Sequence, residues 1–224
     1  LFTGPRGVGK TTTARILAMA INSPNSSIGK FDPNSIESRE IATGISMDVI
    51  EIDGASNRGI EEIRNLREQI KFSPMNSKFK IIIIDEVHML TTQAFNALLT
   101  TLEEPPEHGK FIFATTDIHK VPSTIISRCQ RFDFNRISIS DITTRLHSII
   151  QAEGIKMSTE SIFLIAKKAD GSMRDALSLL DQVIAYCDES FEHEKVISAL
   201  GVIQSELYFE FTDAVNDWAF NHSD

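Results

Sequence analysis

Residues 4–11 read Gly4-Pro5-Arg6-Gly7-Val8-Gly9-Lys10-Thr11, a complete match to the pattern G-x-x-x-x-G-K-[ST]. In this pattern the glycines let backbone N–H groups turn inward around phosphate oxygens, the lysine adds a positive charge, and the final hydroxyl can ligate Mg²⁺. A short apolar strand end precedes the loop, and an apolar-periodic segment that predicts a helix follows it, so a helix N-terminus also faces the anion. The alternative is a chance glycine-rich turn, but the strand before it and the helix after it favour a phosphate-binding loop. We expect Thr12, the next residue, to take part in nucleotide binding as well.

Downstream of the loop, strand patterns alternate with helical ones. Four further strands are predicted at 47–52, 80–84, 111–114 and 131–134, and helices are predicted at about 10–20, 60–70, 91–102 and 123–127. Four consecutive isoleucines, at 81–84, indicate a strand that is buried on both faces. Strands that alternate with helices are typical of parallel βαβ units, so the fold class is α/β. Residues 22–44 are polar and rich in Ser, Asn and Pro, which predicts a long excursion, that is, an irregular loop between the first helix and the strand at 47–52.

After about residue 136 no further strand pattern is found. Helices are predicted at 142–152, 158–169, 173–185 and 195–200, each preceded by a turn or cap residue: Ser140, Ser158, Ser172 and the pair Glu192-His193. A last helix is predicted at 205–220. We therefore expect an α/β domain over 1–135, a small helical domain over 136–201 and the start of a third helical domain over 202–224.

The composition limits the function classes. The chain has 224 residues, a formal net charge of −9 and 42% hydrophobic residues, so a sizeable core can form, whereas a broad electrostatic grip on nucleic acid is disfavoured. Any DNA contact is expected to be local. The two cysteines, Cys129 and Cys187, suggest no disulfide and fit a reducing, cytoplasmic compartment. No membrane-span pattern or signal peptide is visible, and a start inside a strand without an initiator Met indicates a fragment.

A second chemical signal is the acidic pair Asp85-Glu86, which directly follows the isoleucine strand. In an open α/β sheet, an acid at the carboxyl end of a buried strand lies beside the phosphate loop. We expect Asp85 and Thr11 to hold Mg²⁺, and Glu86 to orient and activate water for attack on a γ-phosphate. The alternative is a pair of acids that begin a surface turn. A carboxylate poised over water favours hydrolysis over the reaction of a small-molecule kinase.

Three further residues are candidates. Thr116 ends a buried strand, where a polar side chain could sense a γ-phosphate, although strand ends are often followed by Thr and Asp without any function. Arg128, in a Ser-Arg-Cys run, could be an arginine finger for a neighbour's γ-phosphate, or a surface salt-bridge residue. Arg174 lies near a predicted helix start, where the helix dipole disfavours a cation. This hints at an external anion, and pairing with Asp175 or Asp170 is the alternative.

Histidine and cysteine predict no further chemistry. The six histidines show no metal-ligand spacing, and His88 is expected to be a structural hydrogen-bonding residue rather than a ligand. Both cysteines are expected to be thiols at the edge of a core.

Taken together, the sequence motifs of this chain resemble those of the AAA+ clamp-loader ATPases. Within that class they are most similar to the bacterial DNA polymerase III gamma/tau family. The matching runs extend over nearly the whole chain up to residue 201, at 3–11, 49–57, 84–90, 95–99, 102–108, 114–117, 127–129 and 171–179. The run Asp-Glu-Val-His at 85–88, in place of Asp-Glu-Ala-Asp, favours the gamma/tau family over the eukaryotic and archaeal loaders.

The resemblance implies a three-layer AAA+ P-loop domain with a parallel sheet, a small all-helical lid and the start of a helical collar. It implies ATP and Mg²⁺, ATP hydrolysis, and loading of the ring-shaped sliding clamp at primed DNA. It assigns Thr116 as sensor 1, Arg128 as the finger that acts in trans and Arg174 as sensor 2. The implied partners are other clamp-loader subunits in a hetero-oligomeric ring, the clamp, primer–template DNA and, through a C-terminal tail, the polymerase core, but no membrane. Nothing resembles a polymerase active site, so a nucleotidyltransferase label would describe the complex.

One departure from the family concerns zinc. The family carries four zinc-binding cysteines in the excursion after the first helix, and here Ser23, Asp32, Ser35 and Ser38 stand at the corresponding positions. Serine hydroxyls are poor Zn²⁺ ligands. We therefore predict that no zinc is bound and that other packing must hold this segment, unless it is mobile.

Two other protein classes stay open. One is a scaffold module that binds ATP but mainly holds partners, although Lys10 and Glu86 argue against an inactive site. The other is a different AAA+ motor, such as a branch-migration helicase subunit, and binding of the sliding clamp would separate such a motor from a clamp loader.

Overall fold

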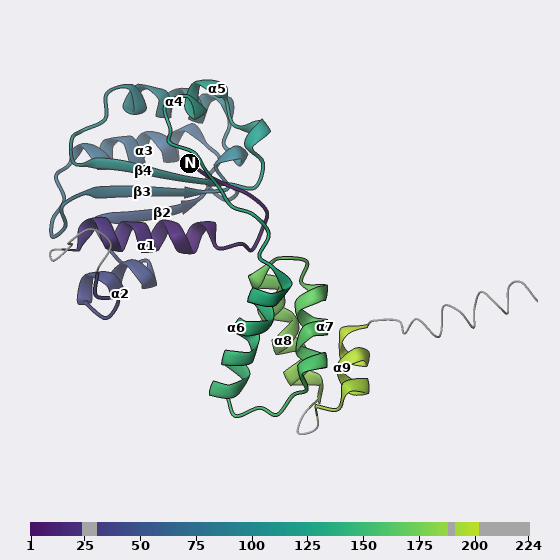
Figure 1. Cartoon of the computed structure of the whole chain (residues 1–224). Helices are drawn as coiled ribbons and strands as arrows, with labels where there is room; N and C mark the ends of the chain where they lie inside the picture. The colour runs from purple at the N-terminus through teal and green to yellow at the C-terminus, as the bar shows by residue number, and fades with distance from the viewer. Residues whose placement is uncertain (24–30, 188–190, 202–224) are drawn as a thin grey trace, which may run out of the picture. The chain divides into compact units, whose positions relative to one another are not determined.

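The computed structural model describes residues 1–23, 31–187 and 191–201 (Figure 1). The chain divides into two compact units, the first ending at Arg136 and the second beginning at Ile137. The predicted helix at 205–220 and the predicted third domain lie outside the described residues. None of the helices in the described ranges is long and apolar enough to cross a lipid bilayer.

The first unit is built on a five-stranded sheet in the order β2-β3-β4-β1-β5, with all neighbours parallel. The strands are β1 (Phe2–Thr3), β2 (Val49–Asp53), β3 (Lys80–Asp85), β4 (Gly109–Thr115) and β5 (Phe132–Asp133). The register pairs Ile84 of β3 with Phe113 of β4, and Phe2 of β1 with Ala114. The carboxyl ends of β1, β4 and β3 are therefore level, and the predicted α/β class is confirmed.

Helices cover both faces of this sheet (Figure 1). One face carries α1 (Lys10–Asn22) and α2 (Ile36–Thr43), and the other carries α3 (Ile60–Lys71), α4 (Thr92–Glu103) and α5 (Ser123–Ile126). Two short 3₁₀ helices, η1 (Val87–Met89) and η2 (Ile118–Lys120), follow β3 and β4. The result is the three-layer arrangement that was expected.

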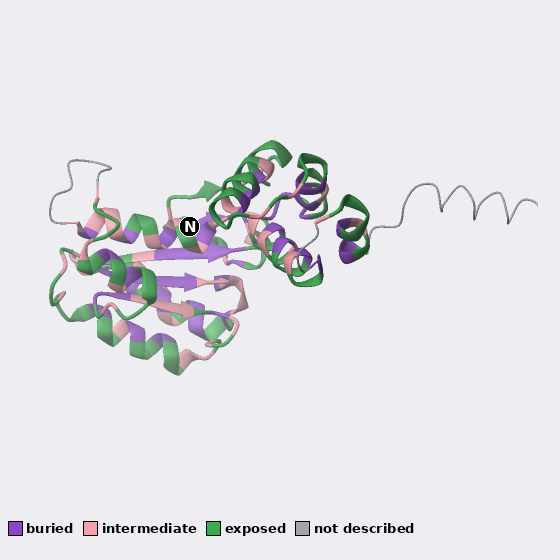
Figure 2. Ribbon diagram, turned by 90° about the horizontal axis from the view of Figure 1, so that it is seen from below, coloured by how far each residue is buried: buried purple, intermediate pink, exposed green. Residues whose placement is uncertain are grey.

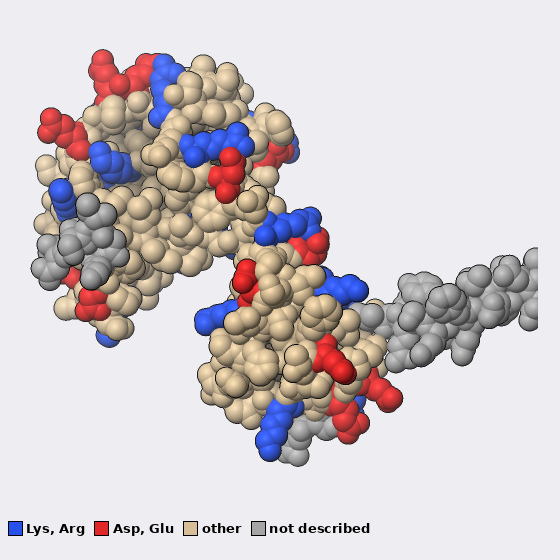
Figure 3. All heavy atoms as spheres, viewed as in Figure 1, with Lys and Arg blue, Asp and Glu red and all other residues tan. Residues whose placement is uncertain are grey.

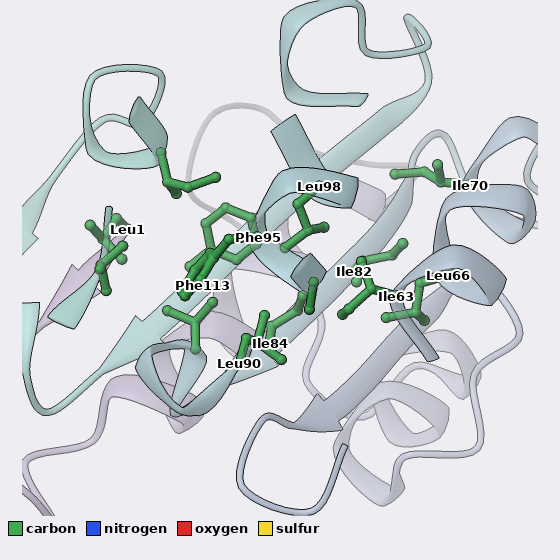
Figure 4. Packing of buried hydrophobic residues seen from close by; sticks show 14 residues of the cluster. Leu1, Ile63, Leu66, Ile70, Ile82, Ile84, Leu90, Phe95, Leu98 and Phe113 are labelled. Carbon is green, nitrogen blue, oxygen red and sulfur yellow. The ribbon is translucent and has the colours of Figure 1, made fainter. Parts of the chain in front are cut away.

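The isoleucine run of β3 forms the centre of two cores. Ile82 and Ile84 pack into the cluster on the α3–α4 side, which Figure 4 shows with Phe95 and Phe113 beside them. Ile81 and Ile83 belong to the cluster on the α1 side. All four isoleucines are fully buried, in agreement with the purple central strands of Figure 2. Each contributes about 1.5–3 kcal/mol of burial free energy, so the strand ends that carry the site rest on a rigid layer.

The excursion after α1 contains a helix that the sequence pattern did not predict. The Oγ of Ser35 accepts a hydrogen bond from the Ser38 N–H and caps the start of α2, and Gly44, with a φ of 74°, ends it. Ile41 is the one apolar side chain of α2 that is buried. A helix that buries one apolar side chain gives almost no periodic signal, which explains why the polar composition of residues 22–44 indicated only loop.

The second unit is a cluster of helices: α6 (Ile139–Ala152), α7 (Thr159–Lys168), α8 (Met173–Cys187) and α9 (His193–Leu200). Its core includes Ile142, Leu146 and Ile162, all fully buried. The expected cap Ser140 is wrong, because α6 begins earlier and the Oγ of Ser138 accepts the Asp141 N–H at its start. Ser158 caps α7 as predicted.

Asp48, just before β2, anchors the loop between α3 and β3. Its carboxylate is buried and accepts hydrogen bonds from the backbone N–H groups of Met75, Asn76 and Ser77 at 2.8–2.9 Å. Burial alone would raise the pKa of Asp48, but these hydrogen bonds outweigh it and hold the pKa below its ordinary value. The ionised carboxylate is therefore favoured in the folded state.

We expect Asp48→Asn to lower the free energy of unfolding by about 1–3 kcal/mol at neutral pH, because an amide cannot accept all three N–H groups. A folded pKa that is depressed gives stabilisation that is complete above the ordinary pKa of about 3.9 and is lost as the pH falls below it. The difference between wild type and variant in urea unfolding should therefore shrink as the pH falls below the ordinary carboxyl range and through the depressed pKa of Asp48. Glu104→Gln, at an exposed acid, is the control, and an equal loss in both variants would contradict the prediction.

Candidate active site

The glycine-rich loop follows β1 and has the backbone conformation that its glycines predict. Gly4, Gly7 and Gly9 all have positive φ. A Cβ at Gly4 would lie 2.2 Å from the backbone oxygen of Phe134, so no larger residue fits there. Gly9, with a φ of 95°, directly precedes α1 and offers no side chain to cap its first turn. The first N–H groups of α1 are therefore left for an anion.

The other loop residues surround this N–H cradle. Pro5, Arg6 and Thr12 are exposed, whereas Val8 is buried. Lys10 is 6% exposed, and its Nζ donates hydrogen bonds to the carbonyl oxygens of Gly4 at 2.8 Å and Pro5 at 2.7 Å. The ammonium group thus lies within the loop, beside the backbone that would hold a phosphate.

Thr11, in the first turn of α1, and Asp85, the last residue of β3, come together at the carboxyl end of the strand. The Oγ1 of Thr11 donates to Asp85 Oδ2 at 2.5 Å, and Asp85 Oδ1 accepts the backbone N–H of Glu86 at 2.8 Å. In the described ranges no three His, Cys, Asp or Glu side chains form a cluster that could hold a metal. One carboxylate and one hydroxyl beside a phosphate cradle fit Mg²⁺, which takes few protein ligands and is completed by phosphate oxygens and waters.

Glu86 lies at the end of β3 in an unusual backbone conformation, with φ and ψ both 45°. Few non-glycine residues adopt this left-handed region, and such strain is concentrated at functional sites. Glu86 Oε2 accepts hydrogen bonds from Thr116 Oγ1 at 2.8 Å and from the Thr116 backbone N–H at 3.2 Å. The structure thus brings together two residues that the sequence analysis had proposed separately.

Two contacts of this site were missed by the sequence analysis. The ring of His88 lies with Nδ1 2.9 Å from Thr115 Oγ1 and 3.3 Å from Glu86 Oε2, so its hydrogen bonds are part of the site. Arg15 of α1 makes two hydrogen bonds of 2.6 and 2.7 Å to the carboxylate of Glu51 on β2. The Glu51 hydrogen bond, together with the charges of Glu51 and Asp85, raises the pKa of Arg15. The one sequence signal for Arg15 is its position four residues after Thr11, on the same helix face.

The two candidate arginines belong to different units: Arg128 lies in the first unit and Arg174 in the second. Arg128 donates from Nη2 to Glu103 Oε1 at 2.7 Å and from Nη1 to the carbonyl oxygen of Thr124 at 2.8 Å. This is the surface salt bridge that was considered as the alternative. Arg174, in the first turn of α8, is exposed, and in the described part of the chain it forms no salt bridge with Asp175 or Asp170.

The residues at the family's zinc positions have local roles. The hydroxyl of Ser35 caps α2 and bonds to that of Ser38 at 3.0 Å, and Asp32 accepts the backbone N–H of Asn34 at 2.8 Å. Ser23 follows α1, and residues 24–30 between these positions lie outside the described residues. Hydroxyl groups that cap a helix serve a purpose that needs no metal.

We predict that equimolar Zn²⁺ produces no heat of tight binding in titration calorimetry with the metal-free chain. The reason is that three hydroxyls and one carboxylate cannot replace a thiolate cluster. A matched variant with Cys at positions 23, 32, 35 and 38 should gain tight binding if this segment has the family's geometry. Tight, stoichiometric binding to the unaltered chain would contradict the prediction.

The fold and the site together define a class. A phosphate loop follows β1 and an acidic pair stands at the end of β3. Thr116 follows β4, the strand that lies between β3 and β1 in the sheet. A small helical unit comes next in the chain. These are the features of an AAA+ P-loop ATPase.

Family models identify the group within this class. Residues 1–138 match the model described as "DNA polymerase III, delta subunit", and residues 141–189 match "DNA polymerase III clamp loader subunit, ATPase lid domain". The first match spans more than half of the chain. The chain therefore belongs to the DNA polymerase III clamp-loader subunit family.

Curated relatives point to the gamma/tau branch. The chain is 50% identical to the DNA polymerase III subunit tau of Bacillus subtilis over 93% of its length and 37% of that protein. It is 46% identical to the subunit gamma of Buchnera aphidicola over 96% of its length and 60% of that protein. For the Escherichia coli subunit tau the identity is 42%, over 96% of the chain and 33% of that protein. The chain thus spans between about a third and three fifths of the length of these relatives.

Solved structures agree at the level of fold. A RuvB Holliday junction branch migration motor of Thermotoga maritima superimposes with a TM-score of 0.66 at 17% identity, over 90% of this chain and 60% of that one. A threonine-to-valine variant of the same protein gives the same values. At this identity the likeness concerns the AAA+ fold alone.

Proposed function

We propose that this chain is the ATP-hydrolysing part of a bacterial clamp-loader subunit, which uses ATP to open the sliding clamp and load it onto primed DNA during replication. The observation that carries the proposal is the convergence of the phosphate loop, the Thr11–Asp85 pair and Glu86 at one edge of the sheet. The sequence kinship with tau and gamma subunits supplies the biological setting. Because the chain spans only part of those relatives, the task of the whole protein is inferred from theirs.

In the proposed reaction, the loop N–H groups between Gly4 and Thr12, together with Lys10, bind the β- and γ-phosphates of ATP. Thr11 and Asp85 hold Mg²⁺, which supplies neutralisation of phosphate charge when bound. Glu86 orients a water molecule through its carboxylate and accepts its proton as the water attacks the γ-phosphate. Thr116 holds the Glu86 carboxylate in place, in the role of sensor 1.

Two arginines extend the proposed site beyond the first unit. Arg128 would serve the nucleotide of a neighbouring subunit, for which it must leave Glu103. Arg174 would reach the nucleotide as sensor 2 from a lid over residues 136–201. The isolated chain should then hydrolyse ATP slowly, because loss of a trans finger costs on the order of 10³-fold or more in related systems.

The proposed partners are the other subunits of a hetero-oligomeric ring, the sliding clamp, primer–template DNA and, through a tail beyond this chain, the polymerase core. We propose a cytoplasmic location, as for replication in bacteria. On the face drawn in Figure 3, acidic and basic side chains are interspersed over the described residues. The net charge of −9 supports a local DNA contact rather than a broad basic surface.

The test is the ATPase rate of the full-length protein assembled with its partner subunits, with and without the sliding clamp and primed DNA. We expect clamp and primed DNA together to stimulate hydrolysis, and a pull-down to recover the clamp in the presence of ATP. A complex that ignores the clamp but hydrolyses ATP on branched DNA junctions would contradict the proposal and favour a branch-migration motor.

A further inference from the structure

We propose that His88 is a positioning residue for hydrolysis, which fixes one oxygen of the Glu86 carboxylate so that the other faces the attacking water. This inference rests on the proposed role of Glu86. It assigns a task to a histidine whose sequence context indicated only a structural hydrogen bond.

The contacts of His88 link the ends of two neighbouring strands. His88 lies in η1, directly after the acidic pair of β3, and its side chain is 8% exposed. Thr115 is the last residue of β4. The Nδ1 atom of His88 lies 2.9 Å from Thr115 Oγ1 and 3.3 Å from Glu86 Oε2. A side chain that is nearly removed from solvent and makes both contacts is held firmly by its surroundings.

The charge of Glu86 determines which ring nitrogen of His88 carries a proton. If Nδ1 carried a lone pair, that lone pair would point at a carboxylate oxygen 3.3 Å away, which is repulsive. A proton on Nδ1 instead makes attractive contacts with both oxygens. Thr115 Oγ1 already accepts the Asp117 N–H at 3.0 Å and still has a second acceptor position for this proton. We therefore assign the Nδ1–H tautomer, shared between Thr115 and Glu86.

The two oxygens of Glu86 then differ. Oε2 lies beside three donors, the hydroxyl and the backbone N–H of Thr116 and the ring of His88. Oε1 receives no hydrogen bond from any described residue. Donors on Oε2 from two directions prevent rotation of the carboxylate, so Oε1 is the oxygen that can orient a water. Without His88, the carboxylate could pivot about its bonds to Thr116.

The test is steady-state ATP hydrolysis by the full-length protein in its assembled complex. We expect His88→Ala to lower kcat by about 10- to 100-fold, the scale of a misplaced catalytic group. KM and nucleotide affinity should stay within about twofold of wild type, because the polar contacts of His88 go to Thr115 and Glu86 and not to the phosphate loop. His88→Asn should keep most of the wild-type rate, because the amide N–H of asparagine lies near the position that Nδ1 has in histidine. His88→Gln places its amide near the position of Nε2 and should behave like alanine.

The control is His108→Ala. His108 Nε2 bonds to the carbonyl oxygen of Ile70 at 3.0 Å, and its backbone pairs with Lys80 at the opposite end of β3 from the site. This variant should lose stability without a specific loss of kcat. Equal rates for His88→Asn and His88→Gln, or a fall in kcat that only tracks thermal stability across all four variants, would overturn the inference.

Parallel variants separate this inference from the proposed function. If Lys10→Ala and Glu86→Gln abolish turnover while His88→Ala equals wild type, only the role of His88 is wrong. If Lys10→Ala and Glu86→Gln also equal wild type, the proposed hydrolytic site itself is wrong.

Discussion

Glu86→Gln should lower kcat for ATP hydrolysis by about 10²- to 10⁴-fold, the contribution of a positioned general base, while nucleotide binding stays within about threefold of wild type. The side chains have the same shape, and the glutamine carbonyl can still accept from Thr116. Its amide group then takes the place of Oε1 and donates hydrogen bonds, so it cannot accept a proton from water. Binding persists because Lys10 and the loop N–H groups are unchanged.

Phosphate release by the assembled complex and the affinity for a fluorescent ATP analogue measure the two effects separately. Glu104→Gln, which neutralises an exposed acid at the end of α4, should behave as wild type. Equal turnover by Glu86→Gln and wild type would favour the scaffold class, in which ATP is bound but hydrolysis is incidental.

Arg128→Ala should reduce turnover at the neighbouring subunit's site by about 10³- to 10⁵-fold, as expected for an arginine finger. Within this chain, Arg128 instead pairs with Glu103, and the two side chains are 36% and 50% exposed. An exposed pair of this kind contributes only about 0–1 kcal/mol to stability. The salt bridge therefore poses a small barrier to reorientation towards a neighbour, and its loss alone cannot cause a large kinetic effect.

Glu103→Gln is the matched control, because it breaks the same salt bridge but keeps the arginine. If Arg128 is a finger, Glu103→Gln should leave turnover nearly unchanged, whereas Arg128→Ala should abolish most of it. In complexes that mix one Arg128→Ala subunit with wild-type subunits, hydrolysis should be lost at the adjacent site rather than at the variant's own. Similar small effects for both variants would show that Arg128 acts only in the salt bridge.

The parts of the fold that could be predicted from sequence are those fixed by local chemistry. The positive φ of Gly4 and Gly9 requires glycine, so the loop was visible in its residue types. The isoleucine run indicated a strand buried on both faces because successive strand residues point to opposite faces, so two of the four apolar side chains lie on each face. By contrast, α2 escaped prediction because it buries only Ile41 among its apolar residues and is otherwise a capped surface helix.

The pairings within the site could not be predicted in the same way. Glu86 and Thr116 are 30 residues apart, and their contact depends on the register between β3 and β4. Arg15 and Glu51 are 36 residues apart and meet only because α1 crosses the face of the sheet. Such contacts arise from tertiary packing, and one sequence contains no pattern that specifies them.

The bonds of Lys10 to the carbonyls of Gly4 and Pro5 tie its side chain to the backbone of the loop that carries it. Together with the positive φ of Gly4, Gly7 and Gly9, these bonds set the shape of the loop as part of the fold. The entropic cost of shaping the loop is thus met once, during folding, and not again at every turnover.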